Sequence, residues 1–103
     1  MARVAHYLKK GLCMYSKITT INNPSGLHAR PAAVFCKAAS GFTSAVTVRK
    51  NEDGAEAKDA KSILMLMGLG LGCGTEIEIA ADGTDEQAAV DALVELVESG
   101  CGE

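Results

Sequence analysis

The sequence predicts an α+β domain in which an antiparallel sheet of four strands carries three helices on one face. Segments that alternate apolar and polar residues are interspersed with segments of helical periodicity, in the order β-α-β-β-α-β-α. Two consecutive strands are joined by a hairpin signal. The chain has 103 residues, 48% of them hydrophobic, which suffices for one domain with a single core.

The first strand is expected at residues 17–22, a short segment rich in β-branched residues. Asn23-Pro24-Ser25-Gly26 follows, with Asn, Pro and Gly at the positions that a type I turn prefers. The first helix is expected at residues 29–40, with Pro31 in the first turn and Gly41 as the C′ residue. Its predicted core face consists of Ala32, Phe35, Cys36 and Ala39.

The middle of the chain predicts a hairpin and a short helix. Residues 44–50 alternate valines with polar residues, which is typical of a half-buried strand. Asp53-Gly54 is a hairpin signal, and residues 55–61 are expected to form a weaker, polar return strand. Its charge suggests either the edge of the sheet or a face open to water. Ser62 is a suitable N-cap for a second helix at residues 63–68.

The glycine-rich segment at residues 68–74 matches neither the dinucleotide-binding nor the Walker phosphate-loop pattern, and it follows a helix instead of a strand. We interpret it as a helix C-cap and a flexible connection. Residues 75–81 form the clearest predicted strand, with Ile77 and Ile79 facing inward and the glutamates outward.

The last helix is expected to run to residue 99, where Gly100 ends it. Thr84-Asp85-Glu86-Gln87 has the residue order of a capping box with acids in the first turn. The predicted core stripe consists of Ala89, Leu93, Leu96 and Val97.

Composition narrows the function classes. The formal net charge of −3 disfavours a nucleic-acid partner, and no apolar run approaches the length of about 18 residues that a membrane span needs. The four cysteines (13, 36, 73 and 101) lack metal-binding or redox spacing. We therefore expect no metal, no cofactor, and free thiols in the reducing environment of the cytoplasm.

Residues 1–13 differ in composition from the rest and do not resemble a signal peptide, because Lys9-Lys10 follows the short apolar piece. We expect either a disordered extension or an upstream start codon, with Met14 as the true initiator. The domain itself is assigned to residues 14–103.

The candidate site is His28, at the boundary between the turn and the first helix. The free N–H groups of Ala29 and Arg30 are expected to point the same way, and a helix N-terminus favours anions. A histidine imidazole is largely neutral near pH 7 and is then a competent nucleophile. With the guanidinium of Arg30, this arrangement can hold a phosphoryl group on the histidine. The alternative is that His28 is only an N-cap residue and Arg30 only a solvated charge.

Four segments together resemble HPr, the family of histidine-containing phosphocarriers of the sugar phosphotransferase system. They are NNPSGLHARPAA, GFTSAVTV, KSIL and DEQAAV, in uninterrupted order between residue 16 and about residue 99. The resemblance implies an open-faced β-sandwich and a phosphohistidine at Nδ1 of His28, with Arg30 stabilising the phosphate charge. It also implies a monomeric carrier, not an enzyme, that receives its phosphoryl group from enzyme I and delivers it to enzyme IIA of sugar permeases.

The resemblance implies two further roles at the second helix. In Gram-positive members the serine that matches Ser62 is phosphorylated by a dedicated HPr kinase/phosphorylase, which links the carrier to a catabolite-control repressor. Ile63, Leu64 and Met67 would normally be assigned to the core, whereas the resemblance places them in a partner-docking patch beside His28. We expect Ile63 and Leu64 to be exposed and Met67 partly so. Thr19 departs from the family pattern, because an inward apolar residue is commoner there.

Two other functions stay open. One is a regulatory carrier of a nitrogen-type phosphotransferase chain, which moves no sugar. The other is a non-phosphorylated interaction module, such as an adaptor or a small RNA-binding domain. The two Phe, two Tyr and absent Trp, with the negative net charge, disfavour an RNA-binding sheet.

Overall fold

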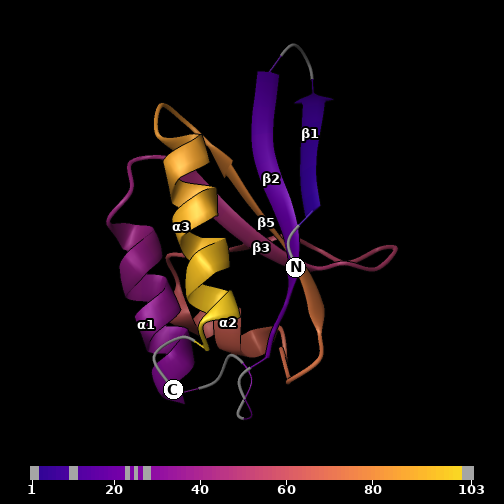
Figure 1. Cartoon of the computed structure of the whole chain (residues 1–103), viewed down its shortest axis with the longest axis vertical. Helices are drawn as coiled ribbons and strands as arrows, with labels where there is room; N and C mark the ends of the chain where they lie inside the picture. Colours follow the sequence, from indigo (N-terminus) through magenta and orange to yellow (C-terminus); the bar gives the residue numbers. More distant parts are fainter. Residues whose placement is uncertain (1–2, 10–11, 23, 25, 27–28, 101–103) are drawn as a thin grey trace.

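The computed structural model describes residues 3–9, 12–22, 24, 26 and 29–100, with the backbone alone for 3–9, 12–14 and 29. One antiparallel sheet has the strand order β1-β2-β5-β3-β4, and α1 and α3 cover one of its faces (Figure 1). The elements are β1 Arg3–Lys9, β2 Leu12–Thr20, α1 Ala29–Ser40, β3 Ala45–Lys50, β4 Lys58–Asp59, α2 Ile63–Gly68, β5 Glu76–Asp82 and α3 Glu86–Glu98.

The predicted α+β order is confirmed from β2 onward. Both of the first two helices have the expected bounds, and the four predicted strands form the β2-β5-β3-β4 part of the sheet. The return strand is much shorter than residues 55–61, because only Lys58 and Asp59 pair with β3. Residues 54–57 are Gly, Ala, Glu and Ala, which are all poor strand formers. The predicted edge position of this strand is confirmed.

The N-terminal segment differs from the expected disordered extension. Its residues 3–9 form β1, which pairs with β2 from Arg3 opposite Ile18 to Lys9 opposite Leu12. Without β1, the edge of β2 that faces away from β5 would present unpaired N–H and C=O groups, and the segment just before β2 in sequence satisfies them. This pairing also explains why β2 starts at residue 12 instead of 17. The start at Met14 stays a prediction.

The core lies between the sheet and the helices. Both predicted helical stripes are confirmed, although Cys36 and Leu96 are only partly buried at its border. The sheet contributes the inward-facing residues of β5 and β3. The largest side chains with less than 2% of their surface exposed are Phe35, Ile21, Leu66, Leu71, Ile77, Ile79, Leu93, Val46, Val48, Val90 and Val97.

Glu78 lies on the face of the sheet opposite the helices, as predicted, but it is buried. Its carboxylate accepts hydrogen bonds from Arg49 Nε at 2.7 Å and from Ser16 Oγ at 3.1 Å. Arg49 stands directly opposite Glu78 on β3, so the strand register alone brings the two charges together. Both glutamates face outward as predicted, but Glu78 is buried under this pair whereas Glu76 is exposed.

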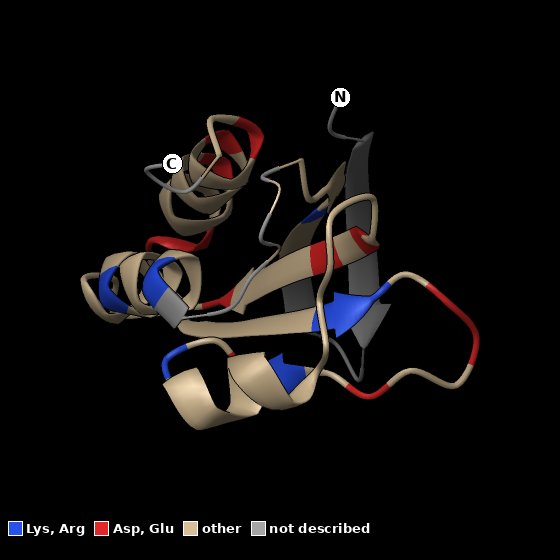
Figure 2. Cartoon of the chain, turned by 90° about the horizontal axis from the view of Figure 1, so that it is seen from below, with Lys and Arg blue, Asp and Glu red and all other residues tan. Residues whose placement is uncertain are grey.

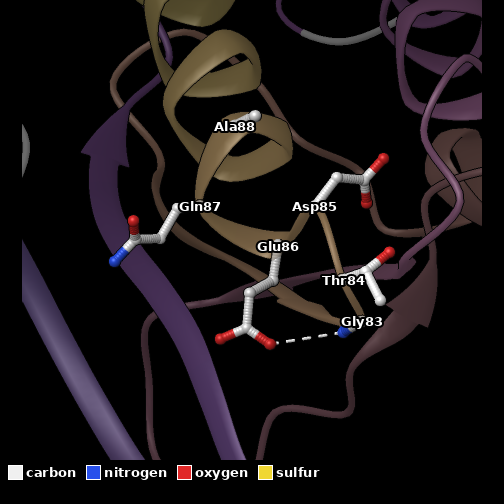
Figure 3. Close-up of a pocket in the computed structure, with 6 residues that line it drawn as sticks. All are labelled: Gly83, Thr84, Asp85, Glu86, Gln87 and Ala88. Atoms are coloured by element: carbon white, nitrogen blue, oxygen red, sulfur yellow. Dashed lines mark hydrogen bonds between the residues drawn. The ribbon is translucent and has the colours of Figure 1, made fainter.

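The start of α3 corrects the predicted capping box. The N-cap is Asp85 instead of Thr84, and its carboxylate makes no bond to its own helix. It accepts the N–H groups of Thr43 and Ser44, each at 2.9 Å, and also the hydroxyl of Ser44. The bonds from Ser44 and Thr43 lower the pKa of Asp85 to about 2. The Glu86 carboxylate accepts the N–H of Gly83 at 3.3 Å, which ties the first turn of α3 to the loop before it (Figure 3).

Candidate functional site

The N-terminus of α1 is the part of the predicted site that the structure describes. His28 lies outside the described residues, as do Asn23 and Ser25 of the predicted turn. The helix begins at Ala29 with Pro31 buried in its first turn, as predicted. The first N–H groups of a helix have no partner within it, so those of Ala29 and Arg30 are available as donors. The side chain of Arg30 is exposed and makes no hydrogen bond or ion pair with the other described residues.

Gly26 fixes the approach of the chain to this helix. It is buried with φ at +69°, and a Cβ atom there would lie 2.3 Å from Leu71 O and 2.7 Å from Gly72 Cα. Only glycine fits both the left-handed backbone and this close approach. The glycine-rich segment at residues 68–74 therefore packs directly against Gly26 in the turn before His28, a contact that the sequence did not predict.

Two backbone hydrogen bonds hold that segment to the end of the β2 region. Gly74 N–H donates to Ile21 O at 2.7 Å, and Ile21 N–H donates to Thr75 O at 2.9 Å. The predicted helix C-cap is confirmed at its start, because Leu69 caps α2 and Gly70 has a φ of +66°. The sequence shows glycines that permit close approach, but only the tertiary structure shows what approaches them.

The C-terminal end of α3 supplies a second attachment. Asn22 Nδ2 donates to Glu98 O at 2.8 Å, and Thr19 Oγ1 donates to the Glu98 carboxylate at 3.0 Å. Thr19 is buried, and this bond explains how a polar residue is accommodated where an apolar one is commoner. The backbone before the site is thus attached both to the glycine-rich segment and to α3.

Ser62 is the N-cap of α2, as predicted. Its backbone is extended, with φ −112° and ψ 113°, and its hydroxyl accepts the N–H of Met65 at 3.4 Å. The side chain is partly exposed. Cys36 on α1 donates its thiol to Lys61 O at 3.1 Å, just before this cap. The start of α2 is therefore joined to the helix that begins beside His28.

The helix α2 exposes most of its apolar side chains. We call the four exposed residues the α2 patch: Ile63 is 36% exposed, Leu64 81%, Met65 47% and Met67 41%. The predicted exposure of Ile63, Leu64 and Met67 is confirmed, whereas Met65 was missed. A helix of six residues buries only one face, and Leu66 fills it here, so five consecutive apolar residues already implied more than one exposed side chain.

The helix α2, which carries this patch, lies at the end of the molecule where α1 begins (Figure 1). No acidic or basic residue occurs between Lys61 and Glu76, so the ribbon of α2 is uncharged while the loop from β3 to β4 carries acidic residues (Figure 2). An exposed, uncharged apolar surface of this kind is common where proteins dock.

A hollow of about 550 Å³ lies elsewhere, at the start of α3, lined by residues 83–88 (Figure 3). Asp85 attaches this region to Thr43, which follows the C-terminal end of α1, so the hollow is remote from Arg30. It is lined by loop and first-turn residues and contains none of the predicted site residues.

The described part of the chain contains no cluster of three or more His, Cys, Asp or Glu residues suited to a metal ion. None of its helices is long and apolar enough to span a membrane. Cys36 and Cys73 are free thiols.

Comparisons with known proteins identify the family. A model described as the PTS HPr component phosphorylation site matches residues 15–99. The chain is 48% identical to phosphocarrier protein HPr of Haemophilus influenzae over 84 residues, which cover 82% of this chain and 95% of that protein. It is 42% identical to phosphocarrier protein NPr of Proteus mirabilis over 83 residues, 81% of this chain and 90% of that protein.

A solved structure agrees with this assignment. The fold matches HPr-C-His from Thermoanaerobacter tengcongensis with a TM-score of 0.78 and 43% identity, covering 85% of this chain and 96% of that one. The matched region of the family model starts after β1, so the hairpin partner of β2 lies outside it. This chain belongs to the HPr family of the phosphotransferase system, and it is a phosphoryl carrier, not a catalytic enzyme.

Proposed function

We propose that this chain accepts a phosphoryl group on His28 from phospho-enzyme I and passes it to enzyme IIA of sugar permeases. One observation carries the proposal. The family model of the phosphorylation site covers residues 15–99, and His28 is the only histidine in that range, because His6 precedes it.

The chemistry follows from the residues around His28. The bond between Nδ1 and phosphorus forms as the bond between phosphorus and the donor breaks, and delivery to the acceptor repeats this exchange. Phosphoryl transfer needs positioning and charge stabilisation more than covalent chemistry from the protein. The N–H groups of Ala29 and Arg30 and the exposed guanidinium of Arg30 would supply that stabilisation. Exposure of Arg30 suits a site that must meet two different proteins in turn.

The α2 patch is proposed as the docking surface for enzyme I and enzyme IIA. Leu64, at 81% exposure, is its most accessible member, and Ile63 and Met67 flank it. Burying apolar surface contributes about 25 cal/mol per Å² of area removed from water. Because a carrier must also leave each partner, a small patch that gives moderate affinity is appropriate.

Ser62 is proposed as a regulatory phosphorylation site in cells that contain an HPr kinase/phosphorylase and a catabolite-control repressor. A phosphate at this N-cap would be tolerated by the positive end of the helix dipole. It would place a charge of roughly −2 beside Ile63, and docking through the α2 patch would then require desolvation of that charge.

The test is the intact mass of the full chain after incubation with phosphoenolpyruvate and enzyme I. We expect one acid-labile phosphoryl group on the wild type and on His6→Ala, and none on His28→Ala. Acid lability distinguishes phosphohistidine from phosphoserine at Ser62. Absence of uptake with several enzyme I proteins would contradict the carrier function and favour a non-phosphorylated interaction module.

A second candidate is the nitrogen-type chain, and similarity to an NPr favours it. The two branches differ in their protein partners, not in the chemistry at His28. Incubating the phosphorylated carrier with a sugar-type and a nitrogen-type enzyme IIA in competition would separate them. Delivery to the sugar-type protein at least tenfold faster would support the sugar branch, and the reverse would assign the chain to regulation.

A further inference from the structure

Two methionines stand out among the apolar residues of α2. Met65 is 47% exposed and Met67 is 41% exposed, whereas Leu66 between them is fully buried. Leu66 is the buried residue of this helix, so the two thioethers lie outside the core that holds the fold together. Both thioethers are therefore open to reagents dissolved in water.

We infer that Met65 and Met67 make the α2 patch sensitive to hydroperoxides, and that their oxidation weakens docking without unfolding the protein. This inference rests on the proposed docking role of the patch. In each step the thioether sulfur attacks the terminal peroxide oxygen with a lone pair. A sulfur–oxygen bond forms and the oxygen–oxygen bond breaks. The alkoxide released, or hydroxide in the case of hydrogen peroxide, takes the proton carried by the transferred oxygen, which gives an alcohol or water beside the sulfoxide. The sulfur loses two electrons and the peroxide gains them.

The expected effect on docking follows from polarity. A sulfoxide turns a flexible apolar side chain into a polar one, and burying a polar group without a hydrogen-bond partner is unfavourable. Two of the four side chains of the α2 patch would then be polar, whereas Ile63 and Leu64 would remain apolar. We expect the concentration of enzyme I needed for half-maximal uptake to rise about tenfold.

The fold is expected to survive this oxidation. The bond that caps α2 involves the backbone N–H of Met65 and the Ser62 hydroxyl, so a change at the sulfur leaves it in place. Leu66 stays buried against the core, and neither sulfur needs to enter it. The thermal unfolding midpoint should therefore shift by less than about 2 °C, the scale of a surface change of a few tenths of a kcal/mol.

Thiols are the competing targets. Cys73 is exposed, and Cys36 is partly buried with its thiol donating to Lys61 O. Dithiothreitol reverses sulfenic acids and disulfides but leaves methionine sulfoxide unchanged, whereas methionine sulfoxide reductases A and B reverse the latter. Treating the oxidised chain with dithiothreitol removes the reversible oxidation of thiols, and the part of the remaining change that the two reductases reverse is then assigned to methionine.

The experiment treats the full chain with hydrogen peroxide and then dithiothreitol, maps sulfoxides by peptide mass, and measures initial rates of phosphoryl uptake against enzyme I concentration. The matched control is Met65→Leu/Met67→Leu, which keeps the patch apolar and similar in volume. We expect the oxidised wild type to need a higher enzyme I concentration for half-maximal uptake, with an unchanged maximal rate. The reductases should restore the original enzyme I requirement, and peroxide should not change the enzyme I requirement of the control.

The outcomes are separable. If reduced wild type takes up no phosphoryl group, the proposed function fails and this inference fails with it. If reduced wild type is active and the Met65/Met67 sulfoxides leave uptake unchanged, the inference alone is overturned. It is also overturned if the leucine variant loses uptake on oxidation as the wild type does, or if peroxide leaves both methionines intact.

Discussion

Gly26→Ala is the substitution that most directly tests how the fold positions the site. It adds one methyl group to the turn before His28, and its contact is with backbone atoms of the glycine-rich segment, not with a movable side chain. The structure therefore predicts a large loss of stability from the smallest change of side chain. The matched control is Gly68→Ala, because a Cβ there meets nothing within 4 Å and the backbone needs no positive φ.

The expected loss of unfolding free energy in Gly26→Ala has two parts. Placing alanine at the φ of +69° that Gly26 adopts costs about 1 kcal/mol. Relieving an approach of 2.3 Å to Leu71 O requires a backbone shift, and overpacking of this kind costs about 1–3 kcal/mol. Together these give roughly 2–4 kcal/mol, a large fraction of the 5–15 kcal/mol typical of a whole domain. Gly68→Ala should be neutral or stabilising by up to about 1 kcal/mol, since alanine is the better helix former.

The assay is urea unfolding at pH 7 for the wild type and both variants. We expect the midpoint of Gly26→Ala to fall without a change of slope, and its phosphoryl uptake to slow at temperatures where it is still folded. If the two alanine variants differ in unfolding free energy by less than about 0.5 kcal/mol, the close packing of Leu71 and Gly72 against Gly26 does not constrain the turn. The proposed positional role of Gly26 would then be wrong.

Three other predictions concern the rest of the fold. Arg49→Met should lower the free energy of unfolding in urea by about 2 kcal/mol, because it leaves the buried Glu78 carboxylate without its charged partner, and Arg49→Met/Glu78→Leu should recover most of that loss. Asp85→Asn should lower the thermal midpoint at pH 7. Because the folded pKa of Asp85 lies below its ordinary value of 3.8, its contribution is complete above that pH and should disappear as pH falls towards about 2, where wild type and variant should converge. Deleting residues 1–13 should leave phosphoryl uptake intact, since we propose that residues 14–103 form the carrier domain; loss of uptake in the mass assay would show that β1 is required.

The helices were predictable because their signals are local. Periodicity and the Ser62 cap place α1 and α2 at their observed bounds. The predicted cap of α3 was wrong because the contacts at this helix end are not local. Thr84 and Gln87 satisfy the local rule for a capping box, but the Asp85 carboxylate binds Thr43 and Ser44, which are distant in sequence. A sequence pattern cannot show that a tertiary donor competes for the same group.

The phosphoryl chemistry at His28 stays a prediction from the surrounding motif. The start of α1 lies where the sequence placed it, but the contacts that support it were not predicted. What could not be read was that Gly26 contacts Gly72 and that Asn22 binds the end of α3, because these contacts depend on the packing of segments far apart in the chain. Alternation likewise placed Glu78 on the outer face, but only the strand order β2-β5-β3 places Arg49 opposite it.

The contrast between buried backbone and exposed side chains suits the proposed transfer between two protein partners. The described residues before His28 are held by the close packing of Gly26 and by the bond from Asn22 to Glu98 O, so the conformational entropy of this part of the chain is lost during folding. Docking then need not order it, and a modest contact with the α2 patch can suffice for transfer. The same reasoning keeps Arg30 and Leu64 in solvent, since contacts held permanently within the fold would not be available to either partner.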